Sequence, residues 1–220
     1  MIRPRLPGLE NDTTTMGNEQ GPGCTAEEAL ARLKEGNARF VGGRGHFPSL
    51  QKDILSDLAQ GQQPYATILG CSDSRVPPEV VFDAHLGELF VVRVAGNVLG
   101  SAIFGTLQYA GAHLRTPLFV VMGHEGCGAV QAAIASRFHG AEHKSRIELL
   151  VDSILPALDG LDGSQPPDAL LHCAVEANVR HTIRTLLDTP EAKAQYATSG
   201  MQLVGAIYEL ETGRVRFLEP

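Results

Sequence analysis

The 220-residue sequence has no tryptophan, and it has no run of about 18 apolar residues that could form a membrane-spanning helix. Residues 1–23 lack the apolar stretch of a secretory signal, and their composition predicts a disordered or extended tail. Lysine and arginine form no cluster interleaved with aromatics, and the net charge is −7. We therefore expect no nucleic-acid partner and no attachment to a membrane.

Cysteine is also scarce, with four residues at irregular spacing: Cys24, Cys71, Cys127 and Cys173. With 43% hydrophobic residues, a chain of this length can bury a core without disulfide bonds. We therefore expect reduced thiols and a cytoplasmic protein. Because no linker or internal repeat divides the chain, residues 24–220 are expected to form a single domain.

Three apolar runs have the length of strands, at residues 65–70, 89–96 and 117–123. They do not alternate polar with apolar residues, which is typical of parallel strands covered on both faces. Helical spacing over residues 101–114 joins the second run to the third and predicts a right-handed βαβ unit. The fold class is therefore α/β, a single domain with a mostly parallel β-sheet flanked by helices.

Further helices are indicated by their starting signals. Thr25 and Glu28 have the spacing of a capping box, and so do Ser145 and Glu148. The segment "GCG" at 126–128 precedes another helix, and a long helix is expected from Pro167 to about Thr189. Two strands separated by a glycine-containing turn should close the chain.

The residues with the clearest chemistry follow two of the predicted strands. Cys71 comes directly after the first strand, while His124 and Cys127 come at the end of the third. The carboxyl ends of parallel strands share one edge, so these side chains should meet there. Two cysteines and one histidine suit zinc, and three protein ligands leave a fourth position open. Taken singly, each residue could be a buried hydrophobe or a solvated histidine.

The string "CSDSRVPPEVVFD", followed by "LGELFVVRVAGN" and "GHEGCGAV", resembles the β-class carbonic anhydrases. The later segments "VEANVRHTIRTL" and "LVGAIYELETGRVRF" are also similar to that family. The resemblance implies one Zn²⁺ per chain, bound by Cys71, His124 and Cys127. It implies a lyase in which zinc-bound hydroxide reversibly hydrates carbon dioxide to bicarbonate and a proton.

The resemblance also implies catalytic roles for Asp73 and Arg75. Asp73 either accepts a hydrogen bond at the open zinc position or binds zinc itself in a closed state. Arg75 holds the carboxylate away from the metal through a bidentate pair. The sequence leaves the choice between these two states open, and a simple ion pair within a turn is the alternative.

Substrate-binding roles are implied for four residues, Gln62, Phe90, Tyr109 and Gly128. The resemblance places Tyr109 in the pocket of a neighbouring subunit, so we expect a homodimer or a multiple of dimers. The family's bicarbonate-inhibited branch uses a tryptophan in its regulatory pocket, which this sequence lacks.

Two other functions remain open from the sequence. The same scaffold could hydrolyse carbonyl sulfide or carbon disulfide, since both are linear and open to the same attack. A non-catalytic zinc protein that senses bicarbonate or redox state is the alternative from another class.

Overall fold

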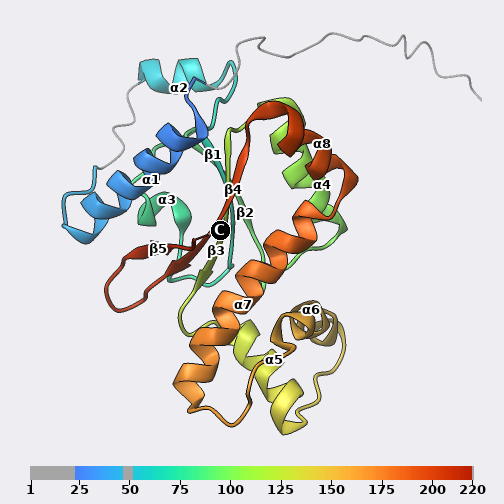
Figure 1. Ribbon diagram of the computed structural model, residues 1–220. Coiled ribbons are helices and arrows are strands. Elements are labelled where there is room, and N and C mark those ends of the chain that lie inside the picture. Colours follow the sequence, from blue (N-terminus) through green and yellow to red (C-terminus); the bar gives the residue numbers. More distant parts are fainter. Residues whose placement is uncertain (1–22, 47–51, 220) are drawn as a thin grey trace, which may run out of the picture.

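The computed structural model describes residues 23–46 and 52–219, which build a five-stranded sheet with helices on both sides (Figure 1). The strand order is β2-β1-β3-β4-β5, and only β5 runs antiparallel to its neighbour. The tail predicted over residues 1–23 lies outside the described residues, except for Gly23. The α/β class and the mostly parallel sheet are confirmed.

The strands are β1 (Ala66–Gly70), β2 (Leu89–Arg93), β3 (Leu118–His124), β4 (Gln202–Tyr208) and β5 (Val215–Phe217). The α-helices are α1 (Ala26–Val41), α2 (Lys52–Leu58), α3 (Pro78–Val81), α4 (Ser101–Tyr109), α5 (Gly128–His139), α6 (Arg146–Ile154), α7 (Pro167–Leu187) and α8 (Pro190–Ser199). Short 3₁₀ turns cover Ala95–Asn97 and Leu155–Leu158, and one π-helical turn, Ala110–Leu114, extends α4.

The predicted strands and the α4 crossover are confirmed, but one of the two predicted capping boxes is wrong. Ser145 precedes α6, yet its side chain makes no capping hydrogen bond. Its φ of 68° and ψ of −141° lie outside the extended region, so the hydroxyl does not reach the helix's free N–H groups. The capping box of Thr25 and Glu28 does form at the start of α1. Helices α2, α3 and α8 have no counterpart in the sequence prediction.

The centre of the sheet is buried along its whole length, as the continuous apolar runs predict. Every residue of β1 and β3 is buried. Helix α7 runs along β3 and β4 (Figure 1). It packs so closely that a Cβ on Gly123 would lie 2.7 Å from a methyl of Val179. The absence of a side chain at Gly123 therefore brings α7 against the strand end that carries His124.

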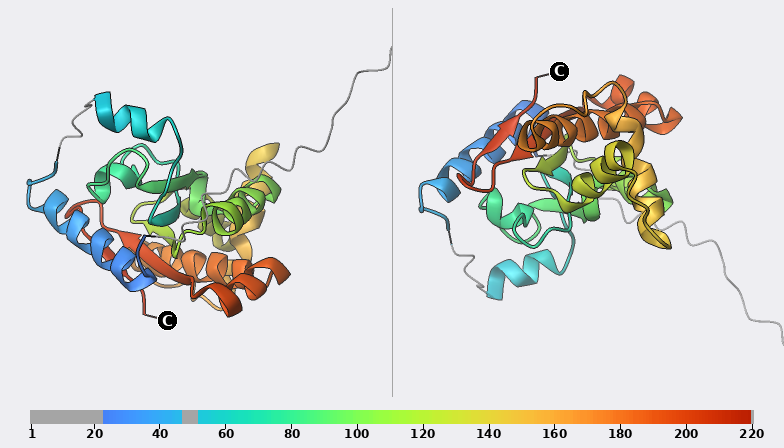
Figure 2. Two further views of the ribbon diagram at one scale, coloured as in Figure 1. Left: turned by 90° about the horizontal axis from the view of Figure 1, so that it is seen from above. Right: turned by 90° about the horizontal axis from the view of Figure 1, so that it is seen from below.

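Helix α1 lies beside the β4–β5 hairpin (Figure 2). The buried amide of Asn37 joins the two, because it donates to the Gly213 and Val81 carbonyls and accepts the Val215 N–H. Among the described helices, none combines the length and the apolar character needed to cross a membrane.

Candidate metal centre

Cys71, His124 and Cys127 converge at the carboxyl edge of the sheet. Cys71 follows β1, His124 ends β3, and Cys127 is the N-cap of α5. One potential ligand atom from each lies within 4.8 Å of the others, and all three side chains are buried. Two neighbouring parallel strands thus bring together residues that lie more than fifty positions apart in the sequence, as the spacing predicted.

The hydrogen bonding of His124 selects the nitrogen that can bind a metal. Nδ1 lies 2.7 Å from the Glu125 carbonyl oxygen, so this nitrogen carries the proton and donates it. In the neutral imidazole, Nε2 is then the nitrogen whose lone pair is free to bind a metal. It is buried, and it has no hydrogen-bond partner among the described residues. A buried acceptor without a partner, beside two thiols, fits a Cys₂His zinc site.

The pKa values of the two thiols are shifted in opposite directions. A hydrogen bond from Cys127 lowers the pKa of the Cys71 thiol, and the N–H of Gly96 also donates to its Sγ over 3.3 Å. The same Cys71 sulfur, together with burial, raises the pKa of Cys127. Without a cation, one of the two sulfurs therefore ionises readily, whereas a divalent ion would favour two thiolates.

Asp73 faces this cluster but is tied to Arg75. Two guanidinium nitrogens, Nε and Nη2, donate to the two carboxylate oxygens over 2.9 and 2.7 Å. These bonds lower the pKa of Asp73. The nearer oxygen, Oδ2, lies 3.9 Å from Nε2 of His124. Arg75 thus orients the Asp73 carboxylate beside the three clustered side chains, and the carboxylate stays outside the cluster.

Arg93, at the end of β2, is a site residue that the sequence reasoning missed. Its Nε donates to the Cys71 carbonyl over 2.9 Å, and its Nη2 donates to the Asp73 carbonyl over 2.5 Å. One guanidinium therefore fixes the backbone on both sides of Ser72. The only signal for this role was a charged residue inside the apolar run of β2.

Of the four predicted substrate-binding residues, one lies at the cluster. Gly128 is the first residue of α5 and is exposed, with no atom within 4 Å of the place a Cβ would take. Its N–H belongs to a helix N-terminus, where anions are stabilised.

The other three, Gln62, Phe90 and Tyr109, lie toward the opposite, amino edge of the sheet. Gln62 is exposed ahead of β1, and Phe90 is level with Thr67 near the start of β1. Tyr109 ends α4, which runs back toward the start of β3, and its ring centroid lies 6.3 Å from that of Phe90. Because β1 is roughly 13 Å long, they do not reach the Cys71 of their own chain.

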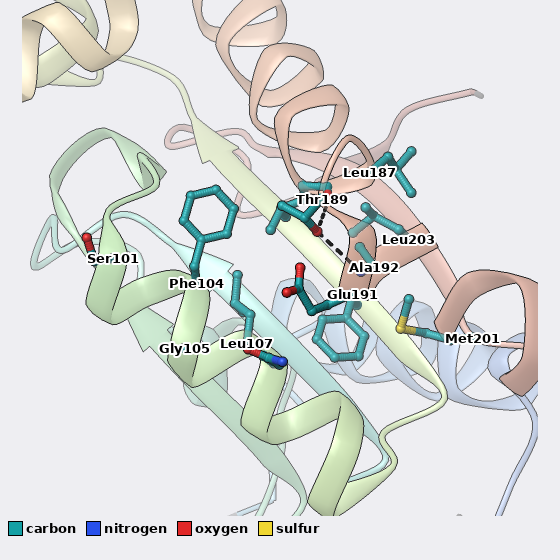
Figure 3. Close-up of a pocket in the computed structure, with 13 residues that line it drawn as sticks. Ser101, Phe104, Gly105, Leu107, Leu187, Thr189, Glu191, Ala192, Met201 and Leu203 are labelled. Carbon is teal, nitrogen blue, oxygen red and sulfur yellow. Dashed lines mark hydrogen bonds between the residues drawn. The ribbon is translucent and has the colours of Figure 1, made fainter. Parts of the chain in front are cut away.

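A separate cavity of about 370 Å³ lies between α4, α8 and the sheet (Figure 3). Its walls are mainly apolar, and it contains none of the predicted site residues. It is lined by Ser101, Phe104, Gly105, Leu107, Gln108, Phe119, Leu186, Leu187, Thr189, Glu191, Ala192, Met201 and Leu203. This cavity is therefore distinct from the buried cluster of Cys71, His124 and Cys127.

The fold and the donor set define an α/β protein with a Cys₂His cluster that could hold a metal ion, at the carboxyl edge of a mostly parallel sheet. Comparison with known proteins narrows that class. The family described as "Carbonic anhydrase" matches residues 66–215. "Carbonic anhydrase 2" of Mycobacterium tuberculosis is 39% identical over 196 residues, which cover 88% of this chain and 93% of that protein.

Two solved structures agree with this result. The β-carbonic anhydrase CafA of Aspergillus fumigatus has a TM-score of 0.68 at 26% identity, covering 88% of this chain and 92% of that one. The Coccomyxa β-carbonic anhydrase, solved with acetazolamide, has a TM-score of 0.66 at 27% identity, covering 76% and 78%. The chain belongs to the β-class carbonic anhydrases, enzymes that reversibly hydrate carbon dioxide.

Proposed function

We propose that this chain hydrates carbon dioxide at a single zinc ion held by Cys71, His124 and Cys127. The observation that carries the proposal is the buried, unpartnered Nε2 of His124 beside two thiols. Soft sulfur and imidazole donors in this number favour zinc and leave one position for a reactant. When bound, the ion supplies Lewis-acid activation of water.

Asp73 and Arg75 are proposed to act as a pair. The Asp73 carboxylate accepts a hydrogen bond from the attacking oxygen and orients its lone pair toward carbon dioxide. The bidentate bond from Arg75 keeps the carboxylate from taking the fourth metal position itself. The paired geometry supports an open fourth position, whereas a closed state would require this pair to break.

Substrate contacts are proposed to come from two chains. The Gly128 N–H would hydrogen-bond bicarbonate from within the chain. Gln62, Phe90 and Tyr109 would complete the site of a second copy, because they lie at the far edge of their own sheet. Tyr109 is 48% exposed in the single chain, which leaves its ring available to a partner. We therefore propose a homodimer or a multiple of dimers.

A cytoplasmic location remains a proposal, supported by four cysteines that occur as free thiols. Hydrolysis of carbonyl sulfide or carbon disulfide is the alternative reaction, since the same attack would serve it. The non-catalytic sensor is less well supported, because Asp73 and Arg75 form the polar pair that water activation needs.

The decisive experiment measures stopped-flow hydration of carbon dioxide between about pH 6.5 and 9, with zinc quantified in the same sample. We expect one zinc per chain and a rate that rises with pH, since two thiolates reduce the charge available to acidify water. Acetazolamide, which binds the Coccomyxa enzyme, should inhibit the reaction. Zinc-loaded protein that leaves carbon dioxide unchanged but releases sulfide from carbonyl sulfide would establish the alternative.

A further inference from the structure

The turn that follows β2 contacts a proposed zinc ligand through its backbone. The N–H of Gly96 donates to Sγ of Cys71 over 3.3 Å, and this hydrogen bond is buried. Hydrogen bonds to a ligating sulfur change how much charge the sulfur gives to its metal. The orientation of this one N–H therefore influences how much charge the Cys71 sulfur would give to a metal.

The turn does not hold this shape by itself. Gly96 has a φ of 68°, and the next residue, Asn97, has a φ of 45°, which is uncommon for a residue with a side chain. Gly96 is also enclosed, because a Cβ there would lie 2.9 Å from Ile154 and 3.0 Å from Ala129. Such a backbone persists only where neighbouring groups fix it.

Two side chains of α7 supply those contacts. The Asn178 amide donates to the Gly96 carbonyl over 2.8 Å, and the Thr182 hydroxyl donates to the Asn97 carbonyl over 3.4 Å. The two residues are four positions apart and thus lie on one face of the helix. They are 1% and 3% exposed, so these polar groups are buried against the turn.

Helix α7 is itself firmly placed. Val175 and Val179 pack against the space that the missing side chain of Gly123 leaves, one residue before His124. The same helix therefore contacts the strand that carries one ligand and the turn that hydrogen-bonds another.

We propose that Asn178 is a positioning residue for the metal centre, acting through the backbone of Gly96 on the Cys71 sulfur, with Thr182 in support. Asn178 fixes the Gly96 carbonyl, and the rigid turn then aims the Gly96 N–H at the sulfur. Loss of the Asn178 amide should weaken metal binding and change the metal–sulfur bond without removing a ligand. The proposal rests on the proposed zinc site.

The test compares Asn178→Ser with Asn37→Ser. Both variants remove a buried amide that bonds backbone carbonyls, but Asn37 joins α1 to the hairpin and lies outside the metal centre. Zinc affinity is measured by competition with a chelator, and the sulfur-to-cobalt charge-transfer band is recorded on cobalt-substituted protein. We expect N178S to bind zinc about 10- to 100-fold more weakly and to shift the band. N37S should lower the melting temperature alone.

An N178S protein with wild-type affinity and an unshifted band would overturn the proposal, because Asn178 would then serve stability only. If N178S does not fold, Thr182→Val decides: a shifted band supports the proposal, and an unchanged band overturns it. Failure of the proposed zinc site is distinguishable, since wild-type protein would then bind no stoichiometric zinc and show no charge-transfer band.

Discussion

The two edges of the central sheet differ in how firmly their functional side chains are fixed. At the carboxyl edge, Cys71, His124 and Cys127 are each less than 5% exposed, and the neighbouring Asp73 carboxylate accepts three hydrogen bonds from Arg75. At the amino edge, Tyr109 is about half exposed. The proposed metal site is therefore preorganised within one chain, whereas the proposed pocket wall is left open, as a site completed by a partner would require.

The strongest test of the carboxyl edge removes a proposed zinc ligand. Cys127→Ser should reduce zinc to well below one per chain and lower the hydration rate by roughly 10³-fold, because several kcal/mol of transition-state stabilisation come from the metal. Metal analysis and stopped-flow kinetics on the same preparation measure both effects. Cys173→Ser, which alters a half-buried thiol of α7, is the matched control and should retain zinc and activity.

The next test leaves the metal in place. Asp73→Asn keeps the size of the side chain but removes the charge that Arg75 pairs with, so hydration should fall about 10²- to 10³-fold while zinc stays at one per chain. The matched control is Asp162→Asn, an exposed carboxylate whose hydrogen bonds within the described part of the chain go to nearby Ser164. An active D73N enzyme would show that the carboxylate only shapes the turn.

Arg93→Met tests whether the backbone of the ligand loop must be held. Its guanidinium donates to the Cys71 and Asp73 carbonyls, so its loss should lower kcat about 10- to 100-fold and weaken zinc binding. Arg137→Met removes an exposed ion pair with Asp159 and should have neither effect. If R93M kept the kcat and zinc affinity of R137M, the loop would keep its shape without Arg93.

At the amino edge, Tyr109→Ala should separate activity from stability. The side chain is about half exposed, so the free energy of unfolding of the single chain should change by about 0.5 kcal/mol or less. Hydration should still fall, by about tenfold, and the dimer should weaken. Kinetics and analytical ultracentrifugation at several concentrations measure these effects. Full activity in a monomeric Y109A protein would exclude the shared site.

The smallest effect concerns pH and Asp83, which lies between α3 and β2. Burial would raise the pKa of this carboxyl, but hydrogen bonds from Arg39 and His46 outweigh it and hold the pKa at about 2. The unfolded value is about 3.9, so the stabilisation is complete above about pH 4 and is lost as pH falls toward 2. Acid unfolding should show a loss on the order of 1–2 kcal/mol in this window, absent in Asp83→Asn.

The sequence predicted the part of the site that lies at the ends of the strands. Continuous apolar runs located β1 and β3, and residues directly after buried parallel strands must share an edge, so Cys71 and His124 could be paired in advance. The roles of Arg93 and Asn178 could not be predicted from the sequence. Both side chains bond backbone carbonyls, which every residue has, so no residue type marks their partners. The cap at Ser145 failed for a related reason, since the spacing of a capping box does not encode the backbone angles that it needs.

The separation of the ligand residues from the pocket residues by the length of β1 has a genetic consequence. In the proposed two-fold dimer, each chain contributes opposite halves to two different sites. A chain damaged in Cys127 and a chain damaged in Tyr109 would therefore complement each other. One site of their heterodimer would carry both defects, and the other would carry neither. Co-expression with two affinity tags, followed by purification of the mixed dimer, should recover more activity than either mutant homodimer shows.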